Sequence, residues 1–153
     1  METIVSDLRP ILKDQRFVDI KSSHKNHVAG AIANIGAIED KKVVAVARRG
    51  KFINIFFEND YVMTIHLKMS GRLIWRDMDG DGSVISAPLK YERTRIDFEK
   101  GSLRFCDVRK FGRVWICPVS EYELVTGIAR LGPEPFASDF SFEKFSRCFS
   151  GKR

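Results

Sequence analysis

Short apolar runs, each closed by turn-forming residues, dominate the middle of the chain and predict β-strands. They are rich in β-branched and aromatic residues, which is typical of strands. Seven strands are predicted in this way: Val43–Ala47, Phe52–Phe57, Tyr61–Leu67, Arg72–Arg76, Arg93–Glu99, Ser102–Asp107 and Arg113–Cys117. Because no long helix separates them, their order favours an antiparallel sandwich or barrel.

Helical periodicity is confined to the two ends of the chain. Residues Glu2–Lys13 place apolar side chains at helical spacing, and Pro10 is expected to kink or end this helix. After the last strand, helices are predicted over Glu121–Leu131 and Ser141–Phe149. Ser141 is a suitable N-cap because its hydroxyl can accept from a backbone amide. The sequence therefore predicts a mainly β fold with flanking helices.

The charge balance and the cysteines limit the partners and the compartment. The 153 residues carry 26 Lys and Arg against 20 Asp and Glu, a net charge of +6, which favours nucleic acid or an anionic surface as partner. No apolar run is long enough to span a bilayer, and no secretion signal is expected. Cys106, Cys117 and Cys148 form no C-x-x-C pair, so free thiols in the cytoplasm are predicted.

Two patterns suggest a metal site but are better explained without one. Asp77–Gly82 resembles the opening of a calcium loop, yet the position of the closing glutamate is Pro88 and the flanks are predicted strands. A solvated hairpin insertion is the better account. His24 and His27 lie in a polar turn without nearby carboxylates or cysteines, so both are expected at the surface. His66 ends a predicted strand, where packing or capping explains it.

Three turn segments carry residues suited to nucleic acid. The sequence Arg48-Arg49-Gly50-Lys51 surrounds a glycine with cations at a strand boundary, which suits phosphate contacts. Met69, Arg109 and Phe111 lie in two later turns. A protein that bends DNA needs apolar wedges to enter the base stack and a planar donor for an exposed base. Local packing explains each of these residues taken singly.

Together these segments resemble the N-terminal domain of formamidopyrimidine-DNA glycosylases. Five motifs occur in the order of that family: Glu2–Pro10 is similar to the continuation of P-E-L-P-E-V-E-T, Arg48–Phe52 to R-R-G-K-Y, His66–Gly71 to H-L-G-M-S-G, Asp107–Gly112 to D-P-R-R-F-G, and Leu131–Pro135 to L-G-P-E-P. The departures are Lys68 for Gly, Val108 for Pro and Lys110 for Arg. The resemblance implies a two-layer antiparallel β-sandwich over residues 1–135. Residues 136–153 are then a helix and the start of a connection to a helix-two-turn-helix domain.

The resemblance also implies a reaction on double-stranded DNA. The family extrudes an oxidised purine, such as 8-oxoguanine or a formamidopyrimidine, breaks its glycosidic bond and nicks the strand by β,δ-elimination, without a small-molecule cofactor. Something must fill the gap that extrusion leaves. By position, Met69, Arg109 and Phe111 are the expected fillers, with Arg109 bonded to the orphaned cytosine. This set favours the formamidopyrimidine branch over the endonuclease VIII branch.

Further residues are carried over from the family by position. Lys51 matches a lysine held at the damaged nucleotide and assigned as a proton donor in β-elimination. Arg93, where the family often has His, and Lys152 align with DNA-contacting positions. The family's nucleophile is an N-terminal proline followed by a glutamate, whereas Met1 falls where the signature has valine. These 153 residues alone are therefore expected to have little activity, and zinc is expected in a C-terminal finger outside them.

Three functions remain open from the sequence. The first is a domain of a DNA glycosylase and AP lyase. The second is a DNA-binding module that has the wedge residues without the nucleophile. The third is a β-sandwich with no nucleic-acid role, which would show no salt-dependent affinity for DNA.

Overall fold

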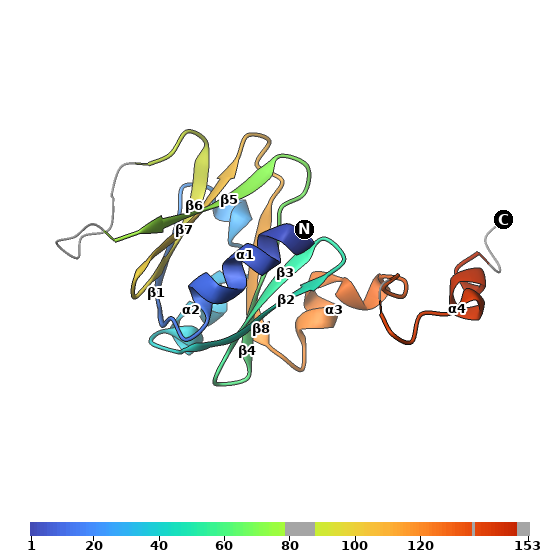
Figure 1. The fold of residues 1–153 in the computed structure, drawn as a ribbon. Coiled ribbons are helices and arrows are strands. Elements are labelled where there is room, and N and C mark those ends of the chain that lie inside the picture. The colour runs from blue at the N-terminus through green and yellow to red at the C-terminus, as the bar shows by residue number, and fades with distance from the viewer. Residues whose placement is uncertain (79–87, 136, 150–153) are drawn as a thin grey trace.

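Two four-stranded antiparallel sheets form the body of the protein (Figure 1). The computed structural model describes residues 1–78, 88–135 and 137–149. In spatial order, the first sheet contains β1 (Phe17–Ser22), β6 (Glu92–Phe98), β7 (Gly101–Asp107) and β5 (Gly71–Asp77). The second contains β2 (Val43–Arg49), β3 (Phe52–Phe57), β4 (Tyr61–His66) and β8 (Arg113–Pro118). The predicted two-layer antiparallel sandwich is thereby confirmed.

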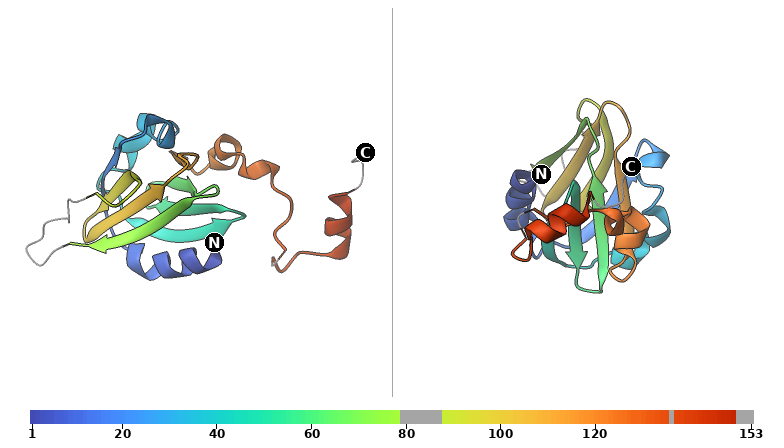
Figure 2. Two further views of the ribbon diagram at one scale, coloured as in Figure 1. Left: turned by 90° about the horizontal axis from the view of Figure 1, so that it is seen from above. Right: turned by 90° about the vertical axis from the view of Figure 1, so that its right-hand side faces the viewer.

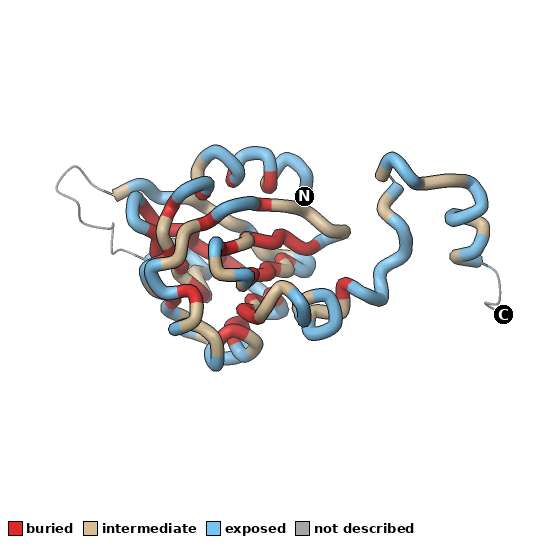
Figure 3. The backbone as a smooth tube through the Cα atoms, turned by 90° about the horizontal axis from the view of Figure 1, so that it is seen from below, coloured by how far each residue is buried: buried red, intermediate tan, exposed pale blue. Residues whose placement is uncertain are grey.

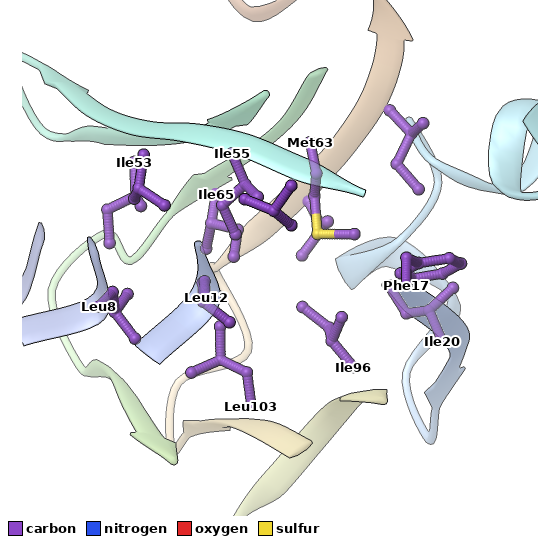
Figure 4. Packing of buried hydrophobic residues seen from close by; sticks show 14 of the residues in the cluster. Leu8, Leu12, Phe17, Ile20, Ile53, Ile55, Met63, Ile65, Ile96 and Leu103 are labelled. Carbon is purple, nitrogen blue, oxygen red and sulfur yellow. The ribbon is translucent and has the colours of Figure 1, made fainter. Parts of the chain in front are cut away.

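Alternation along the strands places one apolar face of each sheet in the core. Ile53 pairs with Ile65, and Ile55 pairs with Met63, and all four side chains are fully buried. Since successive side chains of a strand point to opposite faces, these four share the inner face of their sheet. Figure 4 shows them opposite Leu103 and other buried residues of the first sheet. The two sheets are thus held by burial of apolar surface.

Helix α1 (Glu2–Leu12) covers the outer strand β2 of the second sheet. Its apolar face is buried in the core at Val5, Leu8 and Leu12. The Arg9 side chain donates from Nε to the backbone oxygen of Val46, 3.0 Å away, and so satisfies part of the free edge of β2. Figure 2 shows α1 on one side of the sandwich and α2 (Ile35–Ile38) on the other.

One strand and several short helical turns escape the sequence pattern. Strand β1 was not among the seven predicted, and its buried residues Phe17 and Ile20 are three positions apart. A register shift between Phe17 and Asp19 breaks the alternation that identifies strands. The short helical turns Lys25–His27 and Ile32–Asn34 follow before α2.

The C-terminal part is less regular than predicted. The helix predicted over Glu121–Leu131 is instead α3 (Tyr122–Thr126) followed by a 3₁₀ turn, Ile128–Arg130. Gly127 separates them because its φ of +82° ends the helix in the left-handed region. The helix α4 (Phe142–Arg147) begins as predicted at Ser141, whose side chain accepts from the backbone N–H of Lys144.

The segment that carries α4 extends away from the sandwich (Figures 1 and 2). None of the described residues between 129 and 149 is buried, as the burial colours in Figure 3 show. The proposed division of the chain at residue 135 falls within this segment and stays a prediction. Lys152, expected to contact DNA, lies outside the described residues.

Candidate nucleic-acid interface

Three side chains that are remote in sequence meet at one end of the sandwich. Met69 lies in the turn between β4 and β5, and Arg109 and Phe111 lie in the turn between β7 and β8. Arg109 Nη1 is 3.1 Å from Met69 Sδ, and the guanidinium carbon lies 5.0 Å from the centroid of the Phe111 ring. We call these three side chains the wedge. Met69 is 79% exposed and Phe111 50% exposed, which is unusual for large apolar residues.

A cationic groove adjoins the wedge. It has a volume of about 500 Å³ and is lined by Lys68, Met69, Phe111, Arg113 and Trp115. Arg113 donates to the backbone oxygen of Gly112 at 2.8 Å and so braces the turn that carries Phe111. Lys68 stands where the related motif has glycine, and its φ of +55° lies in the left-handed region that favours glycine. The substitution therefore adds a positive charge at a strained position.

Lys51 lies close to His66, which ends strand β4. Strands β3 and β4 pair Phe52 with His66, and Lys51 precedes Phe52 in an exposed turn. Burial, together with the charges of Lys68 and Lys51, lowers the pKa of His66 to about 4. Its Nδ1 accepts the backbone N–H of Lys68 at 2.9 Å. The neutral ring therefore carries its proton on Nε2 and can act as a donor at neutral pH.

Two of the cations expected to contact phosphate are bound within the protein instead. Arg48 Nη2 and Arg49 Nη1 each lie 2.8 Å from a carboxylate oxygen of Glu134. The backbone N–H of Gly50 donates to the same carboxylate at 2.6 Å. These bonds, first among them the one from Arg49, lower the pKa of Glu134 to about 2. Of this cationic segment, Lys51 is the residue with an exposed side chain.

Sequence reasoning did not identify Glu134 as the partner of these arginines. Both partners lie in recognisable motifs: Glu134 is the acidic residue of L-G-P-E-P, and the arginines belong to the motif at Arg48–Phe52. Their separation of more than 80 positions gives no indication of contact without the fold.

Asp107 lies beneath the wedge and is 1% exposed. Its carboxylate accepts from the hydroxyl of Ser70 and from the backbone N–H of Gly112, the latter at 2.8 Å. Burial disfavours the ionised form, but hydrogen bonds from Ser70, Gly112 and His27 outweigh it and hold the pKa of Asp107 below its usual value. Arg93 Nε donates to the backbone oxygen of Asp107 at 2.9 Å, so Arg93 lies at the same end of the sandwich as the wedge.

The expectation that His27 lies at the surface is wrong. Its side chain is fully buried, its Nε2 lies 3.2 Å from Asp107 Oδ2, and its ring packs against Phe105. Burial lowers the pKa of His27, although Asp107 opposes this shift. The carboxylate partner of His27 could not be recognised from local sequence, because Asp107 follows 80 positions later.

The described parts of the chain, 1–78, 88–135 and 137–149, contain no group of three or more His, Cys, Asp or Glu residues able to hold a metal ion. Cys106, Cys117 and Cys148 are free thiols. The acidic sequence considered for calcium lies mostly outside the described residues, and Asp77 at its start accepts from Trp75 Nε1. Among the same described residues, no helix is long and apolar enough to cross a membrane.

Comparison with known proteins identifies the family. A family model described as "Formamidopyrimidine-DNA glycosylase N-terminal domain" matches residues 1–114. A formamidopyrimidine-DNA glycosylase of Gloeobacter violaceus is 40% identical over 109 residues, which are 69% of this chain and 36% of the relative. One from Lactobacillus johnsonii is 31% identical across 100% of this chain and 54% of its own length.

Solved structures agree with the fold. The Lactococcus lactis formamidopyrimidine-DNA glycosylase bound non-covalently to DNA with an AP site superposes with a TM-score of 0.80. It is 23% identical, and the match covers 96% of this chain and 55% of that one. The same enzyme with DNA containing FAPY-dG gives the same TM-score. The chain thus spans about half the length of the relatives that match it over its whole extent. The chain belongs to the formamidopyrimidine-DNA glycosylase family and carries its N-terminal domain.

Proposed function

We propose that this chain is the DNA-gripping domain of a base-excision-repair glycosylase and AP lyase that acts on oxidised purines, such as 8-oxoguanine and formamidopyrimidines. The observation that carries the proposal is the wedge. Met69 and Phe111 are exposed apolar side chains, and Arg109 contacts both. Exposed apolar residues beside cations suit insertion into a base stack flanked by phosphates.

The wedge supplies what extrusion of a base requires. Turning a nucleotide out of the duplex costs a few kcal/mol of lost stacking and pairing, and the gap in the stack must be filled. Met69 and Phe111 provide apolar surface for that gap. Arg109 provides a planar set of donors that can bond the exposed edge of the orphaned base.

Cations around the wedge provide attraction to the DNA backbone. Lys51 and Lys68 have exposed side chains, and Arg93 is hydrogen-bonded to the backbone oxygen of Asp107. In the proposed reaction Lys51 stabilises charge at the damaged nucleotide and donates the proton of the β-elimination step. The buried thiols Cys106 and Cys117 lie on strands of different sheets and do not fit a zinc site.

We further propose that these 153 residues alone bind damaged DNA without forming a Schiff base. Met1 is partly buried against the core, and Glu2 bonds Arg9 and Arg48. Met1 stands where the related signature has valine and Glu2 matches its last glutamate, so neither corresponds to the proline or the catalytic glutamate of that signature. The same difference supports the second candidate, a non-catalytic DNA-binding module.

Binding measurements test the proposal. A duplex with a tetrahydrofuran abasic site opposite cytosine should bind more tightly than an intact duplex of the same sequence, because the wedge enters the gap without having to extrude a base. Both affinities should fall as salt rises. Equal affinity for the two duplexes would contradict the proposal. Borohydride trapping on an 8-oxoguanine duplex should yield no adduct with this chain, and a strong adduct would overturn the proposed inactivity.

A further inference from the structure

Asp107 joins the two turns that carry the wedge. Oδ1 accepts the hydroxyl of Ser70, next to Met69, and the backbone N–H of Arg109, the latter at 3.2 Å. Oδ2 accepts the backbone N–H of Gly112 at 2.8 Å and faces His27 Nε2 at 3.2 Å. One buried carboxylate therefore binds both ends of the turn between β7 and β8, and it also binds Ser70 in the turn between β4 and β5.

The backbone of Asp107 reaches a third segment. Its N–H donates to the oxygen of Tyr91 at 2.9 Å, and its own oxygen accepts from Arg93 Nε at 2.9 Å. Met69, Arg93, Arg109 and Phe111, which are predicted to contact DNA, all lie in segments that are hydrogen-bonded to Asp107. The contacts of Asp107 are therefore concentrated on the proposed interface.

His27 completes the set of donors from inside the protein. Its Nδ1 lies 3.3 Å from Thr94 Oγ1, which in turn lies 3.0 Å from Ser22 Oγ. The neutral ring can donate from Nε2 to Asp107 and accept from Thr94 at Nδ1, which fixes one tautomer. A carboxylate that is almost fully buried is tolerated only with such a set of partners.

We propose that Asp107 is the positioning residue of the wedge and that His27 is the buried partner that orients its carboxylate. This inference rests on the proposed function. Exposed apolar side chains tend to collapse onto the protein, and a flexible turn loses conformational entropy when it becomes ordered on binding. Because both turns are bonded to one buried carboxylate, this entropy is already lost on folding and does not weaken DNA binding.

The test compares variants by their preference for abasic over intact duplex at fixed salt. His27→Leu removes both ring hydrogen bonds, and the preference should fall about tenfold, which corresponds to about 1.4 kcal/mol of binding free energy. His27→Gln can donate to Asp107 and should retain the preference within about twofold. Ser70→Ala, at a partly exposed site, should lower the preference in the same way if His27→Leu does not fold.

A control and a double-mutant cycle separate positioning from general stability. Asn59 lies in the turn between β3 and β4, at the end of β4 away from the wedge, and its side chain donates to the backbone oxygen of Ala37 at 2.7 Å. Asn59→Ala removes this bond and should leave the preference unchanged. In a Met69→Ala, Arg109→Ala, Phe111→Ala background, His27→Leu should have no further effect, because its action passes through the wedge.

Each outcome bears on one claim. A folded His27→Leu or Ser70→Ala protein with full preference would overturn the positioning role, and so would an undiminished loss in the background without the wedge. If the parent chain itself showed no preference for the abasic duplex, the proposed function would fail and this inference with it. Circular dichroism of every variant establishes folding independently of DNA.

Discussion

The ion pairs of Glu134 should contribute measurably to stability, and Glu134→Gln removes their negative charge. The drop in the pKa of Glu134 from 4.5 to about 2 corresponds to about 3 kcal/mol in favour of the charged form in the folded protein. The side chains of Glu134, Arg48 and Arg49 are 19%, 21% and 28% exposed, so solvent screens them only in part. We expect the variant to lose about 2 kcal/mol at pH 7.

The stabilising effect of Glu134 should decrease as the pH falls. Because the folded pKa is depressed, the contribution of Glu134 is complete above about pH 5 and declines as the pH falls through the folded value near 2. The difference in unfolding free energy between the parent and the variant should therefore shrink between pH 5 and pH 2. Urea unfolding at 25 °C, followed by the fluorescence of Trp75 and Trp115, measures this difference at each pH.

A second substitution controls for loss of charge as such. Glu39→Gln removes an exposed carboxylate and should change the unfolding free energy by less than about 0.5 kcal/mol. Equal stability of the parent and Glu134→Gln at pH 7 would refute the reasoning. A difference that stayed constant down to pH 2 would also refute it, because the loss would then not arise from the ionised carboxylate.

Three further predictions address the wedge, the backbone contacts and the core. Phe111→Ala should weaken binding to an abasic duplex about tenfold in fluorescence anisotropy and leave intact duplex nearly unaffected, since the ring fills the gap only where a base is missing. Lys51→Gln should lower the magnitude of the slope of log affinity against log salt by about one, as loss of one phosphate contact does. Gly30→Ala should destabilise the fold by about 1–3 kcal/mol in thermal unfolding, because its Cβ would lie 2.2 Å from Trp115, whereas Gly36→Ala meets no atom within 4 Å and should not destabilise it.

The arrangement of the interface separates two kinds of cation. Arg48 and Arg49 hold the segment around Glu134 against the turn between β2 and β3. Lys51, which lies in that turn, keeps its side chain exposed. The ion pairs of Arg48 and Arg49 therefore fix the backbone next to Lys51. In this one motif the two arginines stabilise the fold, and the lysine is exposed to solvent.

Elements with a local pattern could be predicted before the fold was known. Strands β3 and β4 are short, largely apolar runs rich in β-branched and aromatic residues, and both are buried over most of their length. Met69, Arg109 and Phe111 could be identified because they occur in recognisable turn motifs. Their meeting at one end of the sandwich was expected from the family resemblance, and the structure brings them into contact.

Features that depend on distant residues could be recognised only in the folded chain. The broken register of β1 hides its alternation, and the left-handed Gly127 divides what helical periodicity joins. His27 looked like a surface residue because its carboxylate partner, Asp107, is 80 positions away. Periodicity reports which face of an element is apolar, but the burial and pairing of a polar side chain depend on the segments that the fold brings beside it.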